Sequence, residues 1–228
     1  QEPMTSLNPY QKVGTQIEEM LIIHKGMNKK QAKQRTLTLL EKVKIPEPEL
    51  KANSYPHQLS GGQRQRIMIA MALSNDPDLL IADEPTTALD VTVEKSLLEL
   101  LKDLQLQTGM SILFITHDLN IVKKFADEVC VMKDGEIVEK GEVKEVFSNP
   151  KHKYTKKLLN SIPVPKRNIS REGERILFSK DLTVKYLTKR SFIKKNTKYL
   201  KAVNNVSIEV YEGRTTGLVG ESGSGKSS

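Results

Sequence analysis

The sequence predicts an α/β fold built on a mainly parallel sheet. One observation is that short apolar runs, which suit buried strands, alternate with longer segments of helical periodicity. The other is the segment GESGSGKS at residues 220–227, which fits the phosphate-loop pattern that normally joins a strand to a helix. With 228 residues, the chain exceeds one typical domain and has room for one sizeable core plus part of another.

The N-terminal third of the chain carries helical patterns. Helices are expected near residues 14–24 and 29–44, and prolines at positions 46 and 56 mark loops. A third helix is expected from Ser60 to about Ser74, where apolar residues recur at helical spacing until an Asn-Asp-Pro stop. This part of the chain therefore predicts a helical subdomain.

The next part alternates strands with helices. Residues 79–82 and 111–115 are expected to be buried parallel strands, because they are short and almost wholly apolar. Residues 92–107 are expected to form a helix with a leucine-rich face. Residues 129–133 and 136–140 are expected to pair as a hairpin across a two-residue Asp-Gly turn.

Beyond residue 147 the composition changes. A short helix is expected around residues 154–159, and a polar linker follows it. Strands are expected at 176–186 and 202–210, and residues 217–219 are expected to lead as a strand into the phosphate loop. The chain is thereby divided into a first module, an extension with linker, and the start of a second module, at residues 1–147, 148–174 and 175–228.

The composition favours a soluble, intracellular polypeptide. A hydrophobic content of 37% and a mean hydropathy of −0.44 leave no apolar run near the roughly 20 residues that a membrane helix needs. The chain begins with Gln1 and shows no charged-then-apolar leader, so we expect no targeting signal. Cys130 is the single cysteine, which excludes an internal disulfide, and we expect it to be a small buried hydrophobe.

The net charge of +8 is unevenly distributed. Residues 151–201 hold 16 lysines and arginines against 3 acidic residues, a balance of +13, so the rest of the chain is slightly acidic. Such a stretch can attract anionic lipid or nucleic acid. Its basic residues are scattered without interleaved aromatics, however, so a solvated linker with an exposed hairpin is the favoured interpretation.

The phosphate-loop pattern predicts a site for a nucleoside triphosphate with Mg²⁺. Its glycines allow the backbone to curl closely, so that N–H groups at a helix start can face the phosphates. Lys226 is expected to contact the β- and γ-phosphates, and Ser227 to ligate Mg²⁺. The expected nucleotide contacts are Gly220, Ser222, Gly223, Gly225, Lys226, Ser227 and Ser228. A Gly/Ser-rich turn that matches by chance is the alternative, and the other motifs argue against it.

Polar residues follow each of the two predicted parallel strands. Asp83 and Glu84 come at the carboxyl end of the first strand, where open α/β sheets bind ligands. Asp83 is suited to hold hydrated Mg²⁺, and Glu84 to polarise an attacking water as general base. His117 follows the second strand and is expected to contact a γ-phosphate or that water. A strand-capping acidic turn and a structural histidine are the alternatives.

The segment LSGGQ at residues 59–63 opens a predicted helix. Ser60 is a plausible N-cap, and Gly61 and Gly62 expose N–H groups at the helix start, with Gln63 next to them. By itself the segment could be only a cap with a flexible entry.

Together, these motifs resemble those of ABC-transporter ATPases, which are P-loop NTPases with a mainly parallel sheet and a helical signature subdomain. In chain order they are QEP at 1–3, LSGGQ at 59–63, LLIADE at 79–84, ALD at 88–90, THD at 116–118 and the phosphate loop. The resemblance implies the middle of a protein with two fused modules. It also implies that residues 60–62 face the phosphate loop of the second module, whereas Gln1, Asp83, Glu84 and His117 belong to another composite site.

Four segments resemble the importer branch for peptides, glutathione and nickel: QEPMTSLNP at 1–9, YPHQ at 55–58, ADEPTTALD at 82–90 and NPKHKYTKKLL at 149–159. This resemblance implies that Gln1 ligates Mg²⁺ and senses the γ-phosphate, and that Tyr186 stacks on adenine. A plain strand-end tyrosine stays an open alternative for Tyr186. No cysteine follows Cys130, so we expect no iron–sulfur cluster.

The resemblance predicts an ATP-hydrolysing subunit that drives import of peptides or a related small solute. The expected partners are permease subunits in the membrane, a solute-binding protein indirectly and a second ATPase module, without nucleic acid. The expected location is peripheral, on the cytoplasmic face of the inner membrane. The alternatives are a soluble tandem ATPase acting on ribosomes or DNA, and a regulatory nucleotide binder. The chain alone is expected to hydrolyse ATP poorly, because neither composite site is complete.

Overall fold

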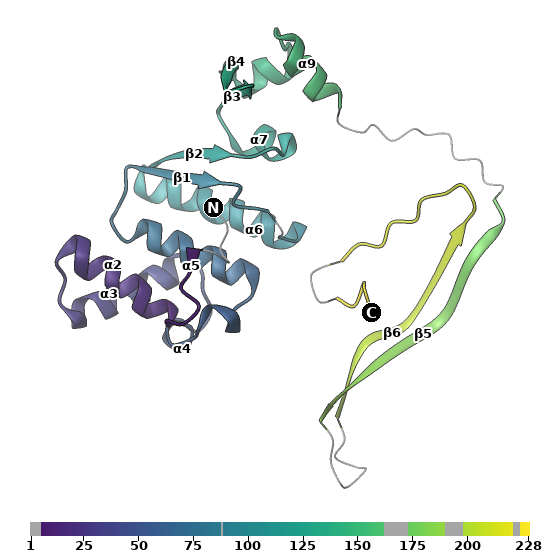
Figure 1. The fold of residues 1–228 in the computed structure, drawn as a ribbon, viewed down its shortest axis with the longest axis horizontal. Coiled ribbons are helices and arrows are strands. Elements are labelled where there is room, and N and C mark those ends of the chain that lie inside the picture. Colours follow the sequence, from purple (N-terminus) through teal and green to yellow (C-terminus); the bar gives the residue numbers. More distant parts are fainter. Residues whose placement is uncertain (1–5, 88, 162–172, 190–197, 221–223) are drawn as a thin grey trace. The chain divides into compact units, whose positions relative to one another are not determined.

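The computed structural model describes residues 6–87, 89–161, 173–189, 198–220 and 224–228. The chain divides into two compact units, Gln1–Ile162 and Pro163–Ser228, which we describe separately (Figure 1). Within the described ranges, no helix has the length and apolar content needed to span a bilayer.

The first unit begins with the expected helical subdomain. Its elements are α2 (Val13–Lys25), α3 (Lys29–Lys42), α4 (Pro48–Ala52), the 3₁₀ helix η1 (Pro56–Gln58) and α5 (Gly61–Leu73). Helix α3 starts with a capping box, in which Asn28 Oδ1 accepts from the Gln31 backbone N–H and Gln31 Oε1 accepts from the Asn28 N–H. The short helices α4 and η1 lie where loops were predicted. Each starts with a proline, which suits the first turn because the missing N–H would have no helical partner there.

Helix α6 (Val91–Thr108) supplies the centre of the core. Asp90 caps its start by accepting from the Val93 backbone N–H at 3.0 Å, and Gly109 ends it with a φ of 71°. Its buried residues recur on one face at intervals of three and four: Leu97, Leu100, Leu101 and Leu104. They share one hydrophobic cluster with apolar residues of α2, α3 and α5, so the predicted helical subdomain and the sheet are packed together.

Strands β1 (Leu79–Asp83) and β2 (Ser111–Ile115) form the expected parallel pair above α6 (Figure 1). The prediction that these strands are buried is wrong for one of their two faces. Leu80 and Ala82 point into the core, whereas Leu79 and Ile81 are 50% and 59% exposed. Side chains alternate between the faces of a strand, and helices of the described part cover only one face of this pair.

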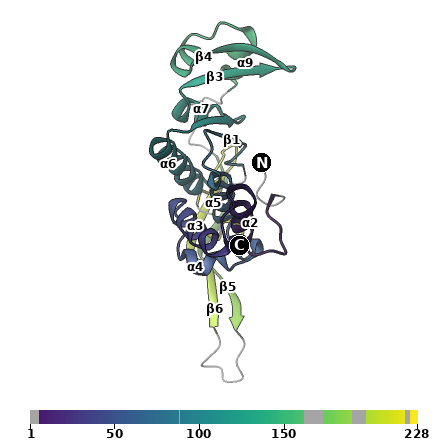
Figure 2. The same cartoon turned by 90° about the vertical axis from the view of Figure 1, so that its left-hand side faces the viewer.

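The remainder of the first unit is built from α7 (Leu119–Phe125), β3 (Glu128–Lys133), β4 (Glu136–Glu142), α8 (Val143–Ser148) and α9 (Lys153–Asn160). The β3–β4 hairpin turns at Asp134 and Gly135, whose φ values of 51° and 84° suit a two-residue hairpin turn. Cys130 is exposed, which corrects the prediction of a buried residue, because it points to the outer face of this hairpin. Figure 2 shows the hairpin and α9 at the opposite end of the first unit from α2–α4.

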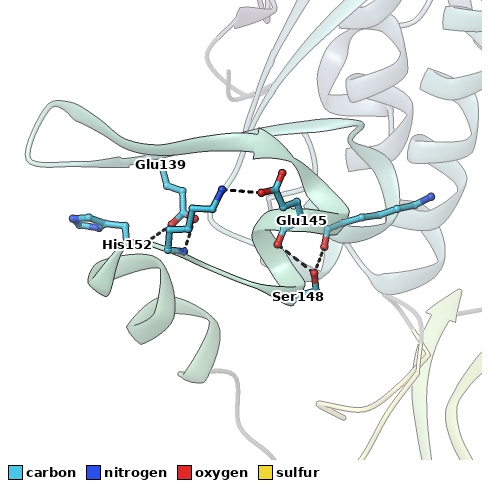
Figure 3. Close-up of polar contacts among 6 residues, drawn as sticks. Glu139, Glu145, Ser148 and His152 are labelled. Atoms are coloured by element: carbon cyan, nitrogen blue, oxygen red, sulfur yellow. Dashed lines mark hydrogen bonds and ion pairs between the residues drawn. The ribbon is translucent and has the colours of Figure 1, made fainter.

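Polar contacts attach the start of α9 to the hairpin (Figure 3). The Glu139 carboxylate accepts from the backbone N–H of Lys151 at 2.7 Å and of His152 at 3.0 Å. The hydrogen bond from the Lys151 N–H is the main cause that lowers the pKa of Glu139. Lys151 Nζ also pairs with Glu145 at 2.8 Å, and His152 Nδ1 caps α9 by accepting from the Tyr154 N–H. The extension therefore begins as a part of the first unit.

The second unit is dominated by a long antiparallel hairpin of β5 (Arg175–Lys189) and β6 (Lys198–Tyr211). Both strands are longer than predicted, because cross-strand pairing continues into their polar ends. The ladder contains several register shifts, and Asp181 and Asn205 near them have φ values of 51° and 53°.

The predicted strand and helix around the phosphate loop are not present in the described part of the second unit. Residues 217–219 form no strand, and residues 224–228 form bends and turns rather than a helix. Leu218 and Val219 are 56% and 89% exposed, with no described strand paired to them. A parallel strand depends on neighbours for its hydrogen bonds and on cover for its side chains, and no described residue supplies either to this segment.

Candidate functional site

The first unit brings Glu84 and His117 together at the carboxyl ends of β1 and β2. The two strands are in register from Leu79 opposite Ser111 to Asp83 opposite Ile115, so the residues that follow them are neighbours. The Glu84 backbone N–H donates to the Ile115 carbonyl at 2.9 Å, which continues the ladder by one residue. The side chains meet directly, with 2.7 Å between His117 Nδ1 and Glu84 Oε1.

This contact sets the charge state of both groups. The hydrogen bond from His117 lowers the pKa of Glu84, and the same hydrogen bond raises the pKa of His117. Glu84 is therefore a carboxylate at neutral pH. Because a carboxylate can only accept hydrogen bonds, Nδ1 of His117 carries the proton and Nε2 is left for another partner. The His117 side chain is 82% exposed, so Nε2 is accessible to a ligand.

A tight turn holds the Glu84 carboxylate from its other side. The Thr87 backbone N–H donates to the Glu84 carbonyl at 3.2 Å, and Thr87 Oγ1 donates to Glu84 Oε2 at 3.0 Å. Glu84 itself has a φ of 47°, in the left-handed region that few non-glycine residues adopt. The sequence interpretation missed Thr87, although its position three residues after Glu84, with a proline directly after that glutamate, is a recognisable turn signal.

Asp83 lies on the opposite face of β1 from the core. It continues the alternation of Leu79 and Ile81, and its side chain is half-buried, with no ion pair to any described residue. No cluster of three or more potential metal ligands is found among the described residues. One carboxylate nevertheless fits Mg²⁺, which usually takes one or two protein oxygens and completes its shell with water and substrate phosphates.

The signature segment forms the start of α5. Ser60 Oγ accepts from the Gln63 backbone N–H at 3.3 Å, and Gln63 Oε1 accepts from the Ser60 N–H at 3.1 Å. A Cβ at Gly62 would come within 2.6 Å of Val93 Cγ1, so a glycine is needed where α5 approaches α6. The capping box is complete without a ligand, and the N–H groups of Gly61 and Gly62 still lie at the helix start, where anions are favoured.

In the second unit, the phosphate loop and Tyr186 line one cavity of about 570 Å³. Lys201 and Ala202 of β6 line it as well, together with residues 224–228. Gly225 has a φ of 91°, and a Cβ there would come within 2.1 Å of the Ala202 carbonyl oxygen. Lys226 Nζ donates to the Gly220 carbonyl and to Ser224 Oγ, so its ammonium group lies over the loop. Ser227 and Ser228 border the same cavity.

Three predicted site residues lie outside the described residues: Gln1, Ser222 and Gly223. Of the others, the structure brings Glu84 and His117 into contact, with Asp83 adjacent in sequence. It also gathers Tyr186 and residues 224–228 around one cavity.

The parallel strands, the acidic pair, the histidine and the glycine-led helix define an ATP-binding cassette. Solved structures of ATP-binding cassettes are similar to this chain. A dimeric ATP-binding cassette in a post-hydrolysis state, bound to ADP and Pi, matches with a TM-score of 0.54 and 33% identity over 63% of this chain and 60% of that one. CbiO1 of Clostridium perfringens, part of an ABC transporter complex, matches with a TM-score of 0.57 and 30% identity over 71% and 62%.

Sequence comparisons place the chain in the ABC transporter family, to which it belongs. The family model for ABC transporters matches residues 2–87, and the model for the C-terminal region of oligopeptide/dipeptide transporters matches residues 138–183. The peptidoglycan transport ATP-binding protein YejF of Agrobacterium fabrum is 53% identical over 99% of this chain. The glutathione import ATP-binding protein GsiA of Salmonella typhimurium is 43% identical over 100% of it.

These results confirm the predicted family, its importer branch and its fold class. The chain spans only about two-fifths of the length of these relatives, 42% of YejF and 41% of GsiA.

Proposed function

We propose that the full-length protein hydrolyses ATP to power the import of peptides or a related small solute, such as glutathione or nickel, through an ABC permease. The observation that carries this proposal is the ionised Glu84 carboxylate, which His117 holds at 2.7 Å beside the carboxyl end of a parallel strand. A carboxylate with a fixed orientation and a free lone pair is suited to take a proton from an attacking water.

The first unit would contribute the hydrolytic groups. Glu84 acts as general base, and His117 orients it through Nδ1 while offering Nε2 to the γ-phosphate. Asp83 and Gln1 would hold Mg²⁺, which neutralises charge on the phosphate oxygens when it is bound. The half-buried position of Asp83 on the open face of β1 supports its share in this role.

The remaining predicted residues would bind nucleotide. The loop residues Gly220, Ser222, Gly223, Gly225, Lys226, Ser227 and Ser228 cradle the phosphates, with Ser227 as a Mg²⁺ ligand in its own site. Tyr186 would stack on adenine, and the cavity that it shares with the loop supports this assignment. Ser60, Gly61, Gly62 and Gln63 would present the N–H groups of the α5 helix start to a γ-phosphate.

The match of residues 138–183 to a region of oligopeptide/dipeptide transporters supports an importer rather than a tandem ATPase of ribosomes or DNA. The partners would be permease subunits, indirectly a solute-binding protein, and a second ATPase module, with no nucleic acid. The protein would lie peripherally on the cytoplasmic face of the inner membrane.

The proposal is tested with the full-length protein and its co-expressed permease in proteoliposomes. We expect ATP-dependent uptake of a labelled peptide mixture, and no uptake with the Glu84→Gln variant, which keeps the shape of the side chain but removes the base. Purification of the protein with ribosomes or DNA, and without a permease, would contradict the importer assignment.

A further inference from the structure

The geometry around Glu84 points to a second side chain that orients the general base: we propose that Thr87 is a positioning residue for the Glu84 carboxylate. This inference rests on the proposed ATP hydrolysis. Thr87 Oγ1 donates to Glu84 Oε2 at 3.0 Å, while His117 Nδ1 binds the other oxygen, Oε1, at 2.7 Å. Each oxygen of the carboxylate therefore has its own donor.

Two hydrogen-bond donors fix the orientation of the carboxylate, whereas one donor leaves the group free to rotate. The terminal torsion of a glutamate side chain is broad, so a carboxylate held through a single oxygen can still rotate about that contact. Donors on both oxygens define the plane of the group and leave one lone pair on each oxygen. A base that is fixed in this way meets the attacking water without reorganisation, which favours proton transfer.

The hydroxyl of Thr87 is not needed to form the turn itself. The backbone closes the turn through the Thr87 N–H and the Glu84 carbonyl, and Pro85 occupies the position that favours such a turn. The Thr87 side chain is exposed and packs in no core cluster. Among the residues that the structure describes, its hydroxyl bonds to Glu84 alone, so the hydroxyl can be removed with the turn left in place.

Two substitutions in the full-length protein separate orientation from turn structure. Thr87→Val keeps the shape and removes the hydroxyl, whereas Thr87→Ser keeps the hydroxyl and removes the methyl group. Steady-state ATP hydrolysis is measured for both, and the rate of Glu84→Gln is subtracted as the part that does not depend on this base. For Thr87→Val we expect kcat to fall about three- to tenfold with an unchanged KM for ATP, the size typical of one lost hydrogen bond. We expect Thr87→Ser to stay within about twofold of the wild type.

The measured rates test the role of Thr87 separately from the role of Glu84. A Thr87→Val variant with wild-type kcat, or a Thr87→Ser variant as slow as Thr87→Val, would overturn the role of Thr87 while Glu84→Gln stays inactive. A rise in KM equal to the fall in kcat would also overturn it, because that pattern indicates lost nucleotide binding. If Glu84→Gln hydrolyses ATP at the wild-type rate, Glu84 is not the general base and the inference fails with it. If the wild type hydrolyses no ATP, the proposed function itself fails.

Discussion

The two units of the chain present their candidate site residues on very different supports. In the first unit, Glu84 and His117 extend from two paired strands that lie on a leucine-rich core. In the second, the phosphate loop borders a two-stranded hairpin whose apolar side chains are largely exposed, among them Phe178 at 50% and Leu200 at 58%. The Glu84–His117 pair thus lies on a packed core, whereas the described part of the second unit gives the phosphate loop no such support.

The largest expected effect concerns the core under the first site. Replacing Leu100, which is fully buried in α6, with alanine should destabilise the first unit by about 3 kcal/mol through lost burial and a residual cavity. Leu182→Ala, at a side chain that is 44% exposed in β5, should cost less than about 1 kcal/mol. Hydrogen exchange of the α6 and β5 amides in the 228-residue chain measures both. Equal losses would contradict the contrast between the two supports.

The elements of the first unit could largely be predicted from sequence because their signals are local. Leucines at helical spacing, the Ser60 and Asn28 capping residues and the Asp-Gly turn each act within a few residues. The exposure of Leu79 and Cys130 could not be predicted, since it depends on which layers cover a face. The lack of a strand at residues 217–219 could not be predicted either, because a parallel strand forms only where a neighbouring strand pairs with it.

The candidate site shows the same contrast between features with a local sequence signal and features without one. Glu84 and His117 were predicted because each follows an apolar strand, and parallel strands bring their carboxyl ends together. The contacts of Glu139 to the start of α9 span 12 and 13 residues and carry no sequence pattern. The hydroxyl of Thr87 was missed for another reason, namely that threonine is common in turns without any function.

The next prediction concerns the loop of the second unit. Gly225→Ala should weaken Mg-ATP binding at this loop on the order of thirtyfold, because the new Cβ meets the Ala202 carbonyl and the backbone has a φ of 91°. Gly217→Ala is the matched control, since a Cβ there meets no atom within 4 Å. Titration of the full-length protein with a fluorescent ATP analogue compares them. Equal affinities for both variants would show that the loop is not built as the structure has it.

Substitutions of His117 separate its two nitrogens. Asparagine can place a donor near the position of Nδ1, and glutamine near that of Nε2. If the orientation of Glu84 dominates, His117→Gln should lower kcat about tenfold, and His117→Asn should lower it less. Steady-state hydrolysis by the full-length protein gives the ranking. The reverse order would assign the main role to Nε2 and its contact with phosphate.

The smallest expected effect concerns the extension. The pKa of Glu139 is lowered by the Lys151 and His152 N–H groups, so its contribution is complete above the ordinary carboxyl pKa of about 4.3. The contribution is lost as the pH falls through the lower folded value. Glu139→Gln should therefore speed exchange of these two amides at about pH 6, and the difference should shrink as the pH falls below the ordinary carboxyl pKa. Glu136→Gln in the same strand is the control, and an equal effect there would contradict the anchoring contact.

The central claim is that Glu84 is held ready as the base for ATP hydrolysis. It is tested most directly by measuring Mg-ATP affinity and turnover together in the full-length Glu84→Gln variant. We predict wild-type affinity and a turnover at least about a hundredfold lower, as expected when a general base is removed. Turnover close to that of the wild type, at the same affinity, would contradict the account.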